Sequence, residues 1–305
     1  MTTIINDVLP LSVNGTAILI GGTQGSLVGN SFFWTNNYWG CGRFYNADVV
    51  KWLKTDWNSN VLRCAMGVDE NGGYLQDPKG NKDRLKTVVE AAIANDMYVI
   101  IDWHSWNAHK YRAQAITFFE EMAKTYGDKC NVIYELYNEP KPGYTWKDDV
   151  KPYAIAVIEA IRAIDKKNLI IVGTTNWSQD VDVAADDPIT GFENIVYALH
   201  FYAVSHHEKL RKKADEAIKQ NLPLFITEWG TVDASGNGTV AREETITWHN
   251  FIKARNLSNT NWSVCDKNEG ASIVKPGTRA DGEWSENDLT ESGKFVRELI
   301  RNWYQ

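Results

Sequence analysis

The chain has 305 residues, of which 43% are hydrophobic and 23% are charged. These values exclude a disordered or fibrous protein. Its 32 basic and 39 acidic residues give a net charge of −7, which argues against a nucleic-acid partner. No run of about eighteen apolar residues is present, so no membrane span is expected, and the first residues lack the basic and apolar segments of a signal peptide.

The four cysteines are far apart in the sequence and show no pair spacing typical of a metal site. Cys64 and Cys265 fall within strand-like runs. We therefore expect Cys41, Cys64, Cys130 and Cys265 to be buried free thiols rather than disulfide partners.

The chain opens with a predicted β-hairpin. Asn14-Gly15 is a strong two-residue turn signal, and short apolar runs at 11–13 and 17–20 flank it. We expect residues 1–24 to form a lid over the bottom of the fold.

After the hairpin, apolar strand-like runs alternate with helical patterns, which predicts βα units and a parallel sheet. The successive predicted strands and helices are 27–33 and 47–57, 60–65 and 83–94, 97–103 and 113–126, 132–136 and 149–164, 169–173 and a short helix near 181, 195–200 and 208–220, 222–227 and 242–254, and 260–265 and 289–301.

Eight such units predict a single (β/α)8 TIM barrel over residues 1–305, because eightfold barrels have about 250 residues or more. No linker or low-complexity segment divides the chain. A doubly wound open sheet is the alternative, but it requires a glycine-rich phosphate turn after its first strand. Here Gly21-Gly22-Thr23-Gln24-Gly25 precedes that strand.

Two of the buried strands lead into a glutamate, Glu139 after strand four and Glu228 at the end of strand seven. An unpaired buried carboxylate is costly, so these strand ends should open into a polar site. In such barrels the active site lies at the carboxyl ends of the strands. The pair indicates acid–base or nucleophilic chemistry, with a structural salt bridge as the alternative.

The other strand ends are polar and aromatic. Arg63 alone would most simply be a structural ion, but two carboxylates at the same mouth make pairing with one of them the functional interpretation. His104 and His200 have no histidine or cysteine at ligand spacing, so we expect no metal site.

In chain order, these strand ends resemble glycoside hydrolase family 5, and within it the bacterial-type endo-β-1,4-glucanase branch. The similarity runs from about residue 25 to the carboxyl terminus. The motifs that carry it are Asp102-Trp103-His104, Asn138-Glu139-Pro140, His200-Phe201-Tyr202, Thr227-Glu228-Trp229-Gly230 and Asn261-Trp262, supported by Phe33-Trp34, Phe44-Tyr45-Asn46-Ala47-Asp48, Gly72-Gly73-Tyr74-Leu75, Trp177-Ser178-Gln179-Asp180-Val181-Asp182 and Asp266-Lys267.

The resemblance implies a retaining β-1,4-glucanase with Glu139 as general acid/base and Glu228 as nucleophile, two carboxyl groups about 5–5.5 Å apart. Arg63 and hydrogen bonds from Tyr202 and His200 would keep Glu228 ionised. The negative charge of Glu228 would favour the protonated form of Glu139.

The resemblance also implies the substrate contacts. Asn138 would bind the sugar 2-hydroxyl and His104 the same sugar. Trp262 would form the floor beneath the cleaved bond, with Trp39 and Trp177 as neighbouring platforms. Lys267 and Glu269 would bind hydroxyl groups on the non-reducing side.

Two positions depart from the family pattern. Trp106 stands where the family commonly has His, so we expect another aromatic platform in place of a polar contact. Cys265 stands where the branch often has Asn, a change expected to be neutral.

The resemblance implies no cofactor and a monomer that acts on β-1,4-glucan or cello-oligosaccharides. Cellulose cannot enter a cell, so we expect a secreted enzyme, although a smaller oligosaccharide substrate would not require export. The alternatives are a β-mannanase or xyloglucanase of the same family, a non-catalytic β-glucan-binding protein, and a metal-dependent hydrolase, which the sparse histidines disfavour.

Overall fold

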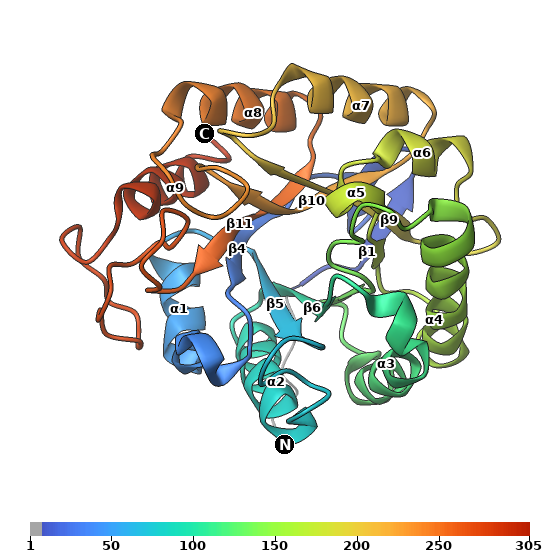
Figure 1. Cartoon of the computed structure of the whole chain (residues 1–305), viewed down its shortest axis with the longest axis horizontal. Coiled ribbons are helices and arrows are strands. Elements are labelled where there is room, and N and C mark those ends of the chain that lie inside the picture. The colour runs from blue at the N-terminus through green and yellow to red at the C-terminus, as the bar shows by residue number, and fades with distance from the viewer. Residues whose placement is uncertain (1–7) are drawn as a thin grey trace.

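The computed structural model describes residues 8–305, in which eight parallel strands close into a barrel surrounded by helices (Figure 1). The strands follow chain order around the barrel, and the last pairs with the first. The predicted (β/α)8 barrel is confirmed. The barrel strands are β4 (Val28–Phe32), β5 (Val61–Gly67), β6 (Tyr98–His104), β7 (Val132–Glu135), β8 (Ile170–Val172), β9 (Ile195–Tyr202), β10 (Leu224–Gly230) and β11 (Ser258–Val264).

The helices lie on the outside of the barrel (Figure 1). They are α1 (Ala47–Thr55), α2 (Pro78–Ala94), α3 (Arg112–Tyr126), α4 (Lys151–Ile164), α5 (Thr175–Ser178), α6 (Val181–Asp186), α7 (Glu208–Lys219), α8 (Arg242–Ala254) and α9 (Glu291–Arg301), with short turns η1 (Asn37–Trp39), η2 (Cys41–Phe44), η3 (Ala108–Tyr111) and η4 (Trp146–Val150).

Element boundaries differ from the prediction mainly where polar residues begin or end an element. Helix α2 begins at Pro78 rather than at residue 83, because Asp77 caps it by accepting a hydrogen bond from the backbone N–H of Gly80 at 2.9 Å. Strands β9 and β10 continue to Tyr202 and Gly230, since their polar and aromatic ends remain paired. The site residues on these strands therefore stand on paired strand backbone.

The N-terminal hairpin becomes a three-stranded antiparallel sheet of β1 (Leu11–Asn14), β2 (Ala17–Ile20) and β3 (Thr23–Gln24). Leu11 and Ile18 belong to an apolar cluster with residues from the amino-terminal halves of the barrel strands. The sheet thus covers the end of the barrel opposite the strand carboxyl ends. Residues 1–7 of the predicted 1–24 segment lie outside the described residues.

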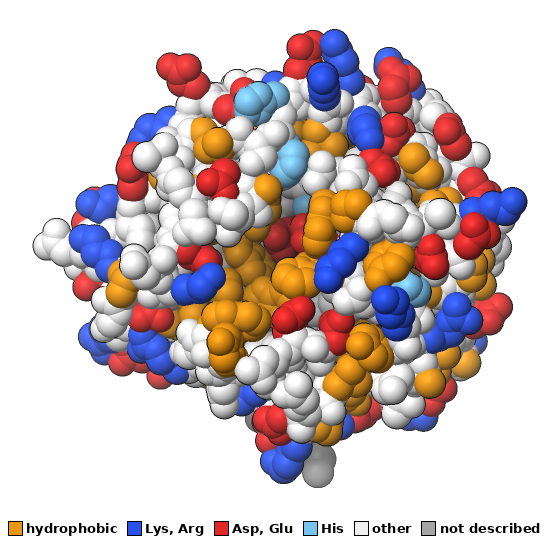
Figure 2. All heavy atoms as spheres, viewed as in Figure 1, with side chains coloured by type: hydrophobic (Ala, Val, Ile, Leu, Met, Phe, Trp, Pro, Cys, Tyr) orange, Lys and Arg blue, Asp and Glu red, His pale blue; other side chains and the backbone are white. Residues whose placement is uncertain are grey.

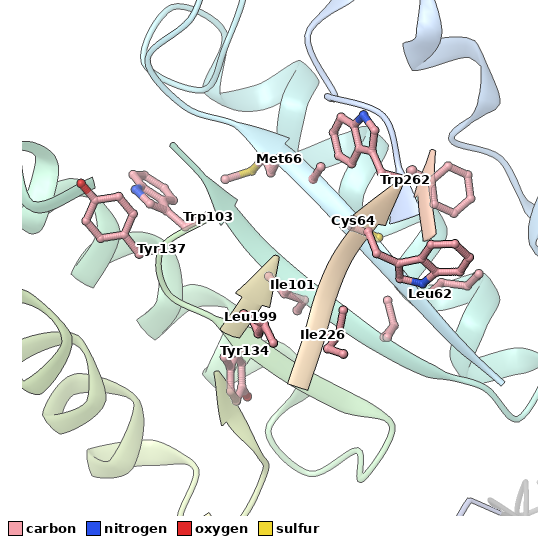
Figure 3. Close-up of a cluster of buried hydrophobic side chains, with 14 of the residues drawn as sticks. Leu62, Cys64, Met66, Ile101, Trp103, Tyr134, Tyr137, Leu199, Ile226 and Trp262 are labelled. Atoms are coloured by element: carbon pink, nitrogen blue, oxygen red, sulfur yellow. The ribbon is translucent and has the colours of Figure 1, made fainter. Parts of the chain in front are cut away.

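The barrel interior changes from apolar to polar along the strands. Side chains of β5 alternate, so that Leu62, Cys64 and Met66 pack in the layer between barrel and helices (Figure 3). Val61 lies in the apolar cluster at the bottom of the barrel, and Arg63, two residues further along, makes its contacts inside. The same change on neighbouring strands assembles charged side chains near the mouth.

The prediction that all four cysteines are free thiols is wrong. Cys41 and Cys265 form a disulfide, with Cα atoms 5.5 Å apart and 224 residues between them in sequence. Barrel closure explains the pairing, because β11 lies beside β4 and so brings together the loops that follow these strands. Cys64 is a buried thiol, and the partly buried Cys130 thiol donates to the carbonyl of Val8.

Within residues 8–305, no helix combines the length and apolar character needed to cross a bilayer.

Candidate active site

A cleft of about 450 Å³ opens at the carboxyl ends of the strands. Figure 2 shows this hollow, with hydrophobic side chains around it and acidic side chains in its depth. Most of the predicted site residues line it. The lining residues are Phe33, Trp34, Trp39, His104, Trp106, Asn138, Glu139, Trp177, Gln179, His200, Tyr202, His206, Glu228, Ala234, Ser235, Gly236, Trp262, Lys267 and Glu269.

Arg63 lies beneath the cleft with no exposed surface and makes its closest contacts with four side chains. Its Nη1 is 2.9 Å from Glu228 Oε2, and its Nε donates to Glu135 Oε2 at 2.7 Å. Its Nη2 donates to Asn138 Oδ1 at 2.7 Å and lies 2.9 Å from Asp102 Oδ2. One guanidinium therefore orients groups from three other strands. The sequence pointed to a carboxylate partner for Arg63, and the structure gives it three.

Glu228 has a donor at each of its carboxylate oxygens. Besides Arg63, the hydroxyl of Tyr202 donates to Glu228 Oε1 at 2.7 Å. Burial and the charge of Glu228 raise the pKa of Tyr202, so the phenol keeps its proton and remains a donor. Both carboxylate oxygens of this 4% exposed residue are thus bound by donors.

Irregular strand register explains how consecutive residues reach the same interior. The pairing of β10 shifts between Ile226 and Trp229 on one side and between Phe225 and Glu228 on the other. Regular alternation would send Thr227 and Glu228 to opposite faces. Instead, Thr227 donates to Glu135 at 2.7 Å while Glu228 meets Arg63.

Glu139 is more exposed than Glu228 and has a different partner. Its Oε1 lies 3.0 Å from His200 Nδ1, and its backbone N–H donates to the carbonyl of Ser105 at 3.3 Å. His200 was expected to support Glu228, but the structure places it against Glu139. The other ring nitrogen, Nε2, lies 2.8 Å from Thr227 Oγ1.

Electrostatics favour a charged His200. Burial opposes the imidazolium, but interactions with Glu135, Glu139 and Glu228 outweigh this and raise the pKa of His200 to about 9. For Glu135, burial is again unfavourable to charge, yet Arg63 and His200 lower its pKa to about 2. Both groups are therefore ionised near neutral pH.

His104 is different, because burial and the charge of Arg63 lower its pKa. Its Nδ1 lies 2.6 Å from Asp102 Oδ2, and its ring stacks on that of Trp262 at 5.3 Å with an interplanar angle of 4°. Burial, together with the charges of Glu135 and Glu228, raises the pKa of Asp102. His104 is thus a neutral, oriented imidazole in the cleft.

We refer to Arg63, Asp102, Glu135, Thr227 and His200 as the polar network. Asp102, Glu135 and Thr227 were not proposed as site residues from the sequence. A signal for Glu135 existed, since it is a carboxylate within a strand buried along its whole length. Like Glu139 and Glu228, this carboxylate would be costly without a partner.

We refer to Trp39, Trp106 and Trp177 as the aromatic rim. Trp106 contacts Trp34 and Trp177 edge to face, at ring distances of 5.2 and 6.0 Å. Trp39 contacts Trp34 at 5.4 Å. Trp177 has a φ of 62°, a left-handed conformation that is uncommon for a bulky residue and is found where a site fixes the backbone.

Lys267 and Glu269 line the cleft and form an ion pair with each other. The Lys267 ammonium also lies 5.4 Å from the centre of the Phe33 ring. Burial raises the pKa of Glu269 against the opposing effect of Lys267. These two side chains thus offer a paired donor and acceptor at one side of the cleft.

Among residues 8–305, two groups bring three potential metal ligands within 4.8 Å of one another, Cys41 with Cys265 and Asp266, and Glu139 with His200 and Glu228. In the first, the sulfur atoms are bonded to each other. In the second, both ring nitrogens of His200 have protein partners. The closeness of the two glutamates is chemically useful without a metal.

A family model described as "Cellulase (glycosyl hydrolase family 5)" matches residues 14–268. Endoglucanase Z of Dickeya dadantii is 56% identical over 294 residues, which cover 96% of this chain and 67% of that protein. An endoglucanase of Clostridium saccharobutylicum is 48% identical over 260 residues, covering 84% of this chain and 58% of that protein. The chain thus spans about three fifths to two thirds of the length of these relatives.

Solved structures agree with these matches. A structure from Cytophaga hutchinsonii superposes with a TM-score of 0.94 at 48% identity, covering 98% of this chain and 97% of that one. A variant of the Thermobifida fusca endoglucanase Cel5A catalytic domain, in complex with cellotetraose, superposes with a TM-score of 0.89 at 31% identity, covering 96% and 97% of the two chains.

Proposed function

The chain belongs to the cellulase family of glycosyl hydrolases, family 5, and from this we propose that it is a retaining endo-β-1,4-glucanase. Glu228 acts as nucleophile and Glu139 as general acid/base. One observation carries this assignment: an oxygen of Glu139 lies within 4.8 Å of an oxygen of Glu228. Retaining enzymes place the two carboxyl groups about 5–5.5 Å apart, whereas inverting enzymes need about 6.5–9.5 Å to admit water.

In the first step, Glu228 attacks the anomeric carbon while Glu139 gives its proton to the leaving oxygen. A glycosyl ester forms on Glu228, and the bond to the leaving sugar breaks. In the second step, Glu139 takes a proton from water, which attacks the same carbon and releases Glu228. Arg63 and Tyr202 keep Glu228 ionised and aligned before attack.

The neighbouring side chains have roles consistent with these steps. Arg63 holds the amide oxygen of Asn138, so the group that Asn138 can offer to a sugar 2-hydroxyl is its Nδ2–H donor. A donor there strengthens its bond as the transition state forms. His104 and Trp262, stacked on each other, contact the sugar that is cleaved.

The substrate is a β-1,4-glucan chain. The flat faces of glucose rings stack on aromatic side chains, and Trp39, Trp106 and Trp177 present such surfaces along the cleft. Lys267 and Glu269 bind hydroxyl groups. Two of the relatives are named endoglucanases, and one similar structure holds cellotetraose. The enzyme is secreted, because an insoluble polymer must be met outside the cell. It works as a monomer.

Hydrolysis of cellotetraose and cellopentaose, followed by proton NMR, tests substrate and stereochemistry together. We expect internal cleavage with the β-anomer formed first. An initial α-anomer would contradict the retaining mechanism, and faster turnover of mannan or xyloglucan would assign another backbone.

Two variants test the residue roles. Glu228→Gln should abolish hydrolysis of both oligosaccharides and leave cellotetraose binding intact. Glu139→Ala should slow it by roughly 10²–10⁴-fold, the usual contribution of general acid–base catalysis. Glu243→Gln, an exposed residue of α8, is the matched control. Binding without any turnover by the unmodified protein would identify a glucan-binding protein instead.

A further inference from the structure

Glu135 is a buried carboxylate that connects the surroundings of the two catalytic glutamates. It is the last residue of β7 and has no exposed surface. Its Oε2 accepts from Arg63 Nε at 2.7 Å, and its Oε1 accepts from Thr227 Oγ1 at 2.7 Å. Arg63 leads to Glu228, and Thr227 leads through His200 to Glu139.

The direction of the hydrogen bonds in this chain follows from proton counting. An ionised carboxylate only accepts, so the single hydroxyl proton of Thr227 points to Glu135. Towards His200, Thr227 can then only accept. His200 Nε2, 2.8 Å away, must therefore carry a proton.

The proton on Nε2 leaves His200 one exchangeable position, which faces Glu139. With the Nε2 proton fixed, His200 can gain or lose a proton only at Nδ1, the nitrogen 3.0 Å from Glu139 Oε1. The imidazole ring is thus held with its exchangeable position facing the acid/base residue.

We propose that Glu135 is a positioning residue for both catalytic glutamates, fixing the His200 tautomer through Thr227 and the guanidinium of Arg63 through an ion pair. The proposal rests on the roles given above to Glu139 and Glu228. It adds a residue that touches neither substrate nor reacting atoms.

The charges around Glu135 come from four other strands of the barrel. Arg63 on β5 and His200 on β9 are positive, while Asp102 on β6 and Glu228 on β10 are acidic. His104 on β6 is kept neutral by burial and Arg63, which lower its pKa. Removing the charge of Glu135 therefore leaves less negative charge around His200 and Glu139, which favours loss of their shared proton.

The first test is the protonation of His200 in the unmodified protein. With 15N-labelled histidine, and the His200 signal assigned by its loss in His200→Gln, Nε2 should be protonated throughout pH 5–8. A deprotonated Nε2 in this range overturns the proposal whatever the activity.

The second test separates the two connections of Glu135: the hydrogen bonds through Thr227 to His200 (the His200 arm) and the ion pair with Arg63 (the Arg63 arm). Glu135→Gln keeps an acceptor for Arg63 but presents an N–H to Thr227, so the hydroxyl reverses, donates to His200 Nε2 and moves the ring proton to Nδ1. We expect kcat on cellotetraose to fall at least tenfold with KM within twofold. The alkaline limb of the pH profile should move down by about one unit.

Thr227→Val breaks only the His200 arm. It should slow cellotetraose hydrolysis and shift the alkaline limb, but spare the burst with 2,4-dinitrophenyl β-cellobioside, whose leaving group needs no proton. Glu135→Gln should slow this burst as well, because the anchoring of Arg63 is weakened. An unchanged pH limb in Thr227→Val refutes the His200 arm, and an unchanged burst in Glu135→Gln refutes the Arg63 arm.

Two controls exclude a general packing effect. Thr227→Ser keeps the hydroxyl and should restore the alkaline limb. Thr245→Val makes the same exchange at a buried site on α8 and should leave all kinetics unchanged. If the unmodified protein does not hydrolyse cellotetraose, the proposed function fails, whereas wild-type hydrolysis with an unaffected Glu135→Gln refutes only the role of Glu135.

Discussion

The polar network lies mostly beneath the cleft and the aromatic rim lines it, and the two are held by different forces. Arg63, Glu135 and His200 stand on barrel strands, are almost wholly buried, and are oriented by charged hydrogen bonds. Trp39 and Trp177 stand in η1 and α5, the short elements after β4 and β8, and are oriented by contacts with other rings. Chemistry thus depends on strand register, whereas substrate fit depends on loops.

This difference explains why residues of the rim tolerate substitution better than residues of the network. Within the network, register pairs place Asp102 opposite Glu135 and Glu228 opposite His200, so a shift on one strand would misalign partners on the next. The rim has local supports instead. The loop carrying Trp106 is fixed by Asp69, which accepts from Ser105 and Asn107 at 2.7 and 2.8 Å. A rim residue can therefore change without moving the polar network.

The largest effect is expected from removing the guanidinium of Arg63, which pairs with three carboxylates. Arg63→Met would take this positive charge away from Asp102, Glu135 and Glu228. We expect the free energy of unfolding to fall by about 3–5 kcal/mol and cellotetraose hydrolysis to be lost. Urea denaturation measures the first effect. Arg279→Met, which removes an exposed pair with Asp281, should change the free energy of unfolding far less, because solvent screens a surface ion pair. An equal fall in the free energy of unfolding for the two variants would contradict a stabilising role for Arg63 in the network.

The disulfide offers the matching test of the rim. Cys41 follows the turn that carries Trp39, and Cys265 precedes Lys267 by two residues. The double variant Cys41→Ser and Cys265→Ser should lower the free energy of unfolding by about 2–4 kcal/mol. KM for cellotetraose should rise several-fold, while kcat stays within twofold because the network is untouched. Cys130→Ala is the control, and a fall in kcat would show that the two regions are coupled.

The charge of His200 makes the contribution of the network to stability depend on pH. Folding raises the pKa of His200 from its ordinary 6.5 to about 9. Between these values the folded protein keeps a proton that the unfolded chain has lost, so this contribution is complete below pH 6.5 and declines as pH rises to 9. The loss amounts to up to about 3 kcal/mol. The stability difference between wild type and His200→Gln should shrink over this interval. A constant difference would mean that His200 is neutral when folded.

The barrel could be predicted from the sequence because each strand and helix has its own apolar pattern. Glu139 and Glu228 could be predicted because a charge at the end of a buried strand requires an explanation. Glu135 carries the same signal, but its bond to Thr227 could not be predicted in this way. This contact depends on the irregular register of β10, and no local pattern encodes it. The Cys41–Cys265 pair likewise depends on closure of the last strand on the first.

The position of His200 shows the same limit. The strand-end pattern predicted that His200 is in the site, but it did not predict its partner. Because β9 lies beside β10, the sequence was compatible with either glutamate. Only the structure, with Nδ1 at Glu139 and Nε2 at Thr227, decides between them.

The smallest effect should come from the rim residue that departs most from the family pattern. Trp106 contacts Trp34 and Trp177, and the Lys141 ammonium lies 5.0 Å from the centre of its ring. Since an aromatic contact contributes about 0.5–1.5 kcal/mol, Trp106→Ala should raise KM for cellotetraose roughly two- to tenfold. Because the network is untouched, kcat should stay within twofold.

Trp106→Phe and Trp106→His separate stacking from polar contact at this position. Phe should recover most of the affinity if the ring is a platform, whereas recovery by His alone would indicate a hydrogen bond to the sugar. Tyr304→Ala removes an exposed ring near the opposite end of the barrel, where its hydroxyl donates to the carbonyl of Ser26, and should leave KM unchanged. A loss in kcat rather than KM for Trp106→Ala would place this ring in the catalytic geometry. The independence of rim and network would then fail, because the backbone N–H of Glu139 bonds to Ser105, the residue before Trp106.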